Sequence, residues 1–113
     1  MKHSDIQPLT AGGGGYRSLN QEVVIARMSA YAQRKWNCRL STVNRDRRAM
    51  CAYVLRVGFE YQQKDIAAVL GVSQSVISSD LQHAQFHINQ FLHFRKQVRS
   101  IYDYILYNAR YLP

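Results

Sequence analysis

A run of uncharged polar side chains follows a single glycine in the second half of the chain. After Gly71 and Val72, the sequence carries amide and hydroxyl groups on one predicted helix face: Gln74, Ser75, Ser78, Ser79 and Gln82. A carboxamide near the start of a helix can bond both the acceptor and the donor that adenine presents in the major groove of DNA. Gln74 is therefore the strongest candidate base contact, and the other four complete the predicted base-contacting set. None of the five is Arg or Lys, so modest direct readout is expected.

Other residue types with chemical potential are sparse. His83 and His87 are four residues apart and could share a metal with Cys38 or Cys51, but a CxxC spacing is absent, so ordinary surface histidines are expected. The glycine run 12–15 follows no predicted strand, and no paired carboxylates stand out among seven acids. We expect no metal, no cofactor and no enzyme activity.

The charge of the chain points to a polyanion as partner. The formal net charge is +8, and the pI is near 9.9. Eight bases lie between residues 27 and 56 against Asp46 alone: Arg27, Arg34, Lys35, Arg39, Arg45, Arg47, Arg48 and Arg56. The predicted phosphate contacts are Arg45, Arg47, Arg48, Lys64, Ser73 and His83. Four to six neutralised phosphates predict a slope of log K against log salt of about −4 to −5.

Length and hydropathy limit the number of domains and argue against a membrane-spanning segment. A chain of 113 residues with 47% apolar residues can build one compact domain. It has no apolar run of about 18 residues and its first residues lack a hydrophobic signal core, so we expect a cytoplasmic protein without membrane insertion. In such a compartment the two cysteines are expected to remain reduced.

The chain divides into a short tail and a helical domain. Residues 1–17, with Pro8 and four glycines, are predicted to be a flexible tail, and residues 18–113 the domain. The first helix is predicted from a Ser18 cap to about Trp36 or Asn37, with Val24, Met28 and Tyr31 inward. A connection over 38–44 offers Ser41, Thr42 or Asn44 as the next cap. The second helix, from Arg45 to Gly58, is predicted to bury Met50, Tyr53, Val54 and Val57 and to turn Arg45, Arg47, Arg48 and Arg56 outward.

Residues 63–82 have the residue types that a helix-turn-helix requires. A helix over about 62–70 is predicted to end at Gly71, which favours the left-handed conformation of the turn, and Ser73 is predicted to cap the next helix. Ala67 is small where the two helices cross. The predicted wedge core consists of Ile66, Leu70, Val72, Ile77 and Leu81.

The helical extension over 83–113 carries a long apolar seam. Its period continues from Ile77 to Leu112, and it is too wide for a strict two-stranded coiled coil. We expect a bend or break between His93 and Lys96, a tail packed on the domain or on a second copy, and a homodimer through the C-terminal helix. Four tyrosines suit an interface that is partly exposed to water (a half-wet interface): Tyr102, Tyr104, Tyr107 and Tyr111.

The segment from Arg45 to Gln85 resembles the helix-turn-helix of the Trp-repressor-like group, in particular the C-terminal DNA-binding domain of the bacterial replication initiator DnaA, and also region 4 of sigma factors. The resemblance spans about Val23 to Gln85. Ile66, Gly71 and the preceding apolar-Arg helix match in spacing, whereas Val72 to Val76 stand where the initiator has its Arg-Asp-His-Thr-Thr signature. The resemblance implies an all-α fold and binding to double-stranded DNA, without origin recognition. A transcriptional regulator is the first expectation. A replication or recombination accessory factor and a helical protein-interaction module are the alternatives.

Overall fold

Every regular element between residues 19 and 107, the part of the chain that this computed structural model describes, is a helix or helical turn. In chain order these are α3 (Gln21–Tyr31), the π-helical turn η2 (Ala32–Trp36), the short 3-10 helix η3 (Leu40–Thr42), α4 (Arg45–Tyr53), the π-helical turn η4 (Val54–Gly58), α5 (Gln63–Leu70), α6 (Gln74–Gln90) and α7 (Leu92–Tyr107). The predicted all-α fold is confirmed. The predicted tail over 1–17 and the last six residues lie outside the described part. None of the helices described is long and apolar enough to cross a membrane.

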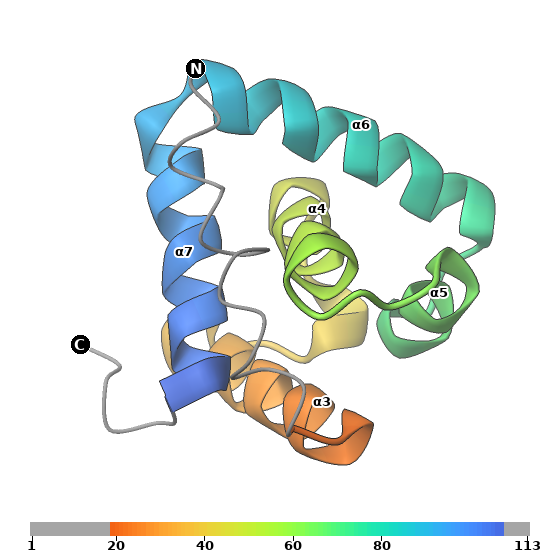
Figure 1. The fold of residues 1–113 in the computed structure, drawn as a ribbon, viewed down its shortest axis with the longest axis vertical. Coiled ribbons are helices and arrows are strands. Elements are labelled where there is room, and N and C mark those ends of the chain that lie inside the picture. The colour runs from red at the N-terminus through yellow and green to blue at the C-terminus, as the bar shows by residue number, and fades with distance from the viewer. Residues whose placement is uncertain (1–18, 108–113) are drawn as a thin grey trace.

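Helix α4 lies at the centre of the molecule. In Figure 1, α6 passes above it, α7 stands on its left, α3 lies below and α5 lies to its right. Residues 49–55 are consequently all buried, as expected for a helix with neighbours on every side. Met50, Tyr53 and Val54 are buried as predicted, whereas Val57 is only partly buried. Val57 lies in η4, where the wider π turn departs from the α-helical spacing on which the prediction depended.

Side-chain caps define where the helices begin. The Asn44 and Ser73 oxygens accept from the backbone N–H groups of Arg47 and Val76, so α4 and α6 begin where predicted. The first helix differs from the prediction. It begins at Gln21, and the Asn20 side chain, rather than Ser18, accepts from Val23 N–H at 2.9 Å.

Helix α7 folds back on the domain after an abrupt break at Phe91. This residue is extended, with φ −128° and ψ 115°, so the break comes two residues before the predicted region. Neither glycine nor proline causes it. The turn lets α7 bury its apolar face against the domain. Tyr31 of α3 makes two contacts with α7: its ring meets the Tyr104 ring edge-on, and its hydroxyl lies 3.1 Å from the Ser100 hydroxyl. Tyr102 and Tyr104 are core residues, so the expectation that they form a half-wet interface is wrong.

Candidate nucleic-acid interface

Helices α5 and α6 are joined by the tight turn that the sequence predicts. Gly71 ends α5 in the left-handed conformation, with φ 71° and ψ 34°, and Val72 N–H donates to the Ala67 carbonyl at 3.1 Å. Three apolar side chains of the predicted wedge are fully buried, Ile66, Leu70 and Ile77, while Val72 and Leu81 are partly buried against the same core. The angle between the two helices is therefore fixed by packing as well as by the turn.

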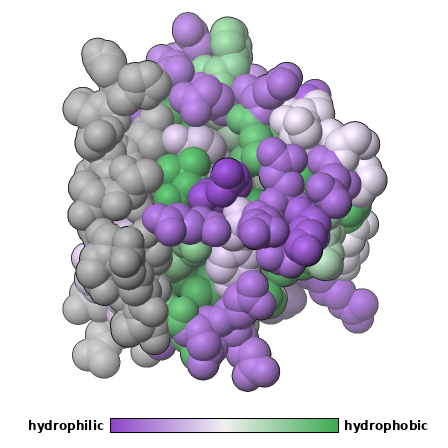
Figure 2. Space-filling model, turned by 45° about the vertical axis from the view of Figure 1, so that its right-hand side comes forward, coloured by the Kyte–Doolittle hydropathy of each residue, from purple (hydrophilic) through white to green (hydrophobic). Residues whose placement is uncertain are grey.

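The outer face of α6 is polar over its first half. All five predicted base-contacting side chains are exposed: Gln74, Ser75, Ser78, Ser79 and Gln82. The opposite face of the helix is buried at Ile77, Asp80, Ala84 and Ile88. Figure 2 brings the α5–α6 side of the molecule forward, and hydrophilic or near-neutral side chains cover most of it, with only separate apolar spots between them.

Asp80 is the buried acid that holds α6 against α4. Its carboxylate is 1% exposed and accepts from Arg48 Nε at 2.5 Å and from the Arg48 NH2 group at 3.1 Å. The same hydrogen bonds raise the pKa of the Arg48 guanidinium. Arg48 is thus partly buried in an ion pair, which departs from the outward, phosphate-facing orientation predicted for it.

Other bases of the second helix also have partners within the chain. Arg47 lies over the Trp36 ring at 5.1 Å, and Arg56 donates to the Tyr61 carbonyl. In the first helix, Arg27 donates to the Ile105 carbonyl and so attaches α3 to α7. Four of the eight clustered bases therefore make contacts that stabilise the fold, although Arg56 is still exposed. The other four, Arg34, Lys35, Arg39 and Arg45, are exposed as well, and Arg45 also pairs with Asp80 at 3.8 Å.

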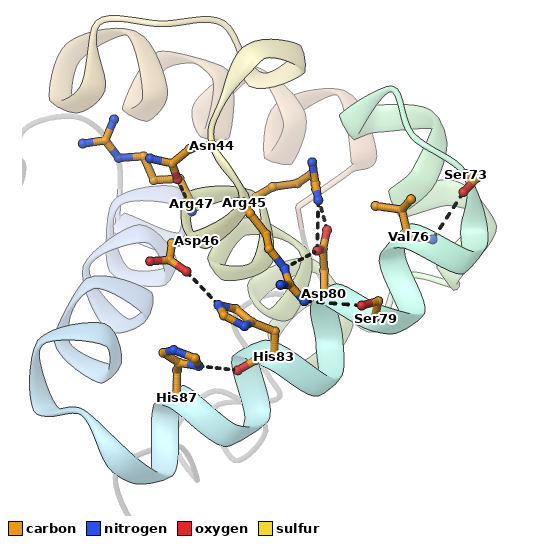
Figure 3. A network of polar contacts seen from close by, with 11 residues as sticks. Asn44, Arg45, Asp46, Arg47, Ser73, Val76, Ser79, Asp80, His83 and His87 are labelled. Carbon is orange, nitrogen blue, oxygen red and sulfur yellow. Dashed lines mark hydrogen bonds and ion pairs between the residues drawn. The ribbon is translucent and has the colours of Figure 1, made fainter.

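Arg45 is a predicted phosphate contact that lies beside the polar face of α6. Its NH2 group is 3.4 Å from the Ser79 hydroxyl, and its side chain remains 56% exposed (Figure 3). Lys64, in the first turn of α5, and Ser73, the cap of α6, are also exposed. These three residues stay candidates for phosphate contact.

His83 faces the protein and not the open surface. Its Nε2 atom is 2.7 Å from an Asp46 oxygen on α4, and its side chain is 16% exposed. This contact, drawn in Figure 3, was not predicted, and it departs from the expectation that His83 reaches a phosphate.

The chain matches no protein-family model, no curated protein and no solved structure.

Two residues near the turn were missed as site residues by the sequence-based prediction. Arg39, counted there only among the clustered bases, is exposed at the start of η3, and η3 packs beside α5. Asp80 was passed over because acids are usually exposed. A signal was present, since Asp80 lies three residues after Ile77 and four before Ala84, on the buried stripe of α6.

Proposed function

We propose that the protein binds double-stranded DNA and that the first half of α6 enters the major groove. One observation carries the proposal. Five neutral hydrogen-bonding side chains lie exposed on the first half of α6, immediately after a tight turn, and the exposed cation Arg45 lies beside them. Arg45 also pairs with Asp80 at 3.8 Å, and its side chain remains 56% exposed. The major groove of B-DNA is about 12 Å wide and admits one α-helix.

Base recognition would depend on amide and hydroxyl groups. Gln74 is in the first turn of α6, where a carboxamide can pair with adenine through two hydrogen bonds. Ser75, Ser78 and Ser79 would add single hydrogen bonds. Without an exposed Arg or Lys among the five positions, the commonest guanine contact is missing, so we expect a preference for A·T-containing sites of modest strength.

Affinity would come from phosphate contacts around this helix. The exposed cations Arg39, Arg45 and Lys64 adjoin α5, α6 or the turn between them, whereas Arg48 would act by positioning α6 through Asp80. With three phosphates neutralised per chain, the slope of log K against log salt is about −3. This is shallower than the sequence alone predicts, because Arg48 and His83 already have partners.

A homodimer is the second part of the proposal, since two copies would double these phosphate contacts and match two half-sites on the DNA. The buried face of α7 cannot serve it, because Val98, Ile101 and Ile105 pack inside their own chain. Contact through α7 would depend on the exposed Leu92 and Tyr107. Light scattering that shows only a 13.1 kDa monomer at high concentration would exclude the homodimer, while the proposal that one chain binds DNA would stand.

A salt-titrated binding assay tests the proposal. Fluorescence anisotropy with a labelled duplex should give a negative slope near −3, and Arg45→Gln should reduce its magnitude by about 1 and weaken all sequences alike. The matched control is Arg99→Gln on α7, which removes the same charge from a partly exposed arginine paired with Asp103. A slope near zero, or equal effects of the two variants, would contradict the proposal. Selection from random duplexes then separates a regulator, which enriches one motif, from an accessory factor, which enriches none.

A further inference from the structure

Three side chains that can bind a metal converge between α4 and α6. Asp46 comes from the first turn of α4, and His83 and His87 are one helical turn apart on α6. One ligand atom from each lies within 4.8 Å of the other two, and Figure 3 shows both imidazoles on the side of α6 that faces Asp46. We propose that these residues bind one transition-metal dication of the Zn²⁺ class.

A hydrogen bond to the backbone orients His87 as a metal ligand. Its Nδ1 atom is 3.0 Å from the His83 carbonyl oxygen, and a carbonyl only accepts, so Nδ1 carries the proton. In the neutral ring the lone pair is therefore on Nε2. A histidine that donates one ring N–H to a backbone carbonyl and offers the other nitrogen has the arrangement common among metal-bound histidines.

His83 and Asp46 would exchange a proton for the metal. In the metal-free chain His83 Nε2 donates to the Asp46 carboxylate over 2.7 Å. A dication between them takes the place of that proton. In a neutral ring the proton moves to Nδ1, which leaves the Nε2 lone pair for the metal, and in a doubly protonated ring it is released to solvent. Zinc bonds of about 2.0–2.2 Å require the nitrogen and oxygen to separate to roughly 3.3 Å. Asp46 is 60% exposed in the first turn of its helix, so its side chain has room for this movement.

The surroundings give the site apolar walls and an entrance. A pocket of about 410 Å³ opens over Asp46 and His87, and Met50, Phe91 and Phe94 form its apolar wall. Phe94 is buried, with its ring 5.4 Å from that of His87. The pocket leaves a fourth coordination position to water. Arg47 also lines it, and its charge makes the affinity lower than that of a closed four-ligand site.

The third ligand of this site differs from those considered from the sequence. Cys38 and Cys51 are free cysteines, but neither belongs to the cluster in the described residues, and the third ligand is the carboxylate of Asp46. Imidazole with carboxylate suits Zn²⁺, Ni²⁺ or Cu²⁺ better than Ca²⁺ or Mg²⁺. A bound ion would join α4 to α6, so it would raise the melting temperature by about 10 °C at a hundredfold excess over Kd.

Isothermal titration calorimetry with ZnCl₂ tests the site on the full chain carrying His3→Ala, which removes the histidine outside the described residues. We expect one ion per chain. Asp46→Asn, His83→Gln and His87→Gln should each weaken binding at least about tenfold, as even outer-shell changes often do. His93→Gln is the matched control, because His93 lines the same pocket outside the cluster, and it should stay within about twofold.

A second measurement covers the case in which a ligand variant does not fold. Co²⁺ added to the His3→Ala chain should give the visible absorption of a four-coordinate site, and Zn²⁺ should remove it. The proposal is overturned if no saturable binding of one ion occurs, or if His93→Gln weakens binding as much as the ligand variants. Neither assay contains DNA, so the result does not depend on the proposed function.

Discussion

Asp80 shows how one side chain determines the position of the whole polar face of α6. Its carboxylate is buried, and the two hydrogen bonds from Arg48 connect the middle of α6 to the middle of α4. A buried charge is tolerated only when it is paired and hydrogen-bonded, because the loss of water around it is costly. Arg48 is therefore a structural residue, and any effect of its substitution on DNA binding would be indirect.

Asp80→Asn should destabilise the fold by about 2–4 kcal/mol, because it leaves a partly buried guanidinium without its counter-charge. Asp103→Asn is the control, since that carboxylate is partly exposed and pairs with Arg99 one turn away on α7. Its cost should be only about 0.3–0.5 kcal/mol. Urea denaturation measures both values, and similar costs for the two variants would refute a structural role for Asp80.

The burial of one thiol and one phenol predicts how stability depends on pH. Desolvation raises the pKa of the Cys51 thiol and of the Tyr53 phenol to about 12 each, from ordinary values of 9.0 and 10.0. Between about pH 9 and 12 the unfolded chain has lost protons that the folded chain retains, so the free energy of unfolding must fall as pH rises. Below about pH 9 these groups contribute no slope. Denaturation curves across this range should show the fall, and Tyr53→Phe should make it shallower; an unchanged slope would show that Tyr53 titrates normally.

At the scale of elements, the turn between α5 and α6 depends on the backbone of Gly71. An added Cβ would meet the Ser41 Cβ at 3.8 Å, an ordinary contact, so space is available and conformation is the constraint. A residue with a Cβ in the left-handed region costs roughly 1–2 kcal/mol, and Asn costs less. Gly71→Val should therefore lower stability by at least about 1 kcal/mol, and Gly71→Asn by clearly less, in thermal unfolding. Equal losses would indicate that packing and not backbone strain limits this position.

Local sequence signals predicted some element boundaries and missed others. The caps at Asn44 and Ser73 and the turn at Gly71 were predictable because short polar side chains and glycine act within a few residues. The break at Phe91 was misplaced because it arises from packing: α7 buries its apolar face only if the chain turns there. Asp80 was missed for a related reason, since its partner Arg48 is 32 residues away.

At the scale of the molecule, the charge count overstated the surface available to DNA. The cluster of eight bases was evident from composition, but Arg27, Arg47, Arg48 and Arg56 have partners that only the tertiary structure reveals. The long apolar seam was likewise predictable as a pattern. Its partner was not, because Ile77, Val98 and Ile105 pack within one chain, and sequence alone leaves a second copy equally possible.

The polar face of α6 is the surface on which the proposed DNA binding depends. The most direct test compares binding of a selected and a random duplex by the unmodified chain and by Gln74→Ala/Ser78→Ala. A matched double variant, Ser29→Ala/Gln33→Ala, removes the same groups from exposed positions of α3 and η2, on the side of α4 away from α6 (Figure 1). We predict that the α6 variant loses its preference for the selected duplex, by about tenfold or more, while its salt slope and fold are unchanged. Retention of that preference, or the same loss in the α3–η2 variant, would contradict the account.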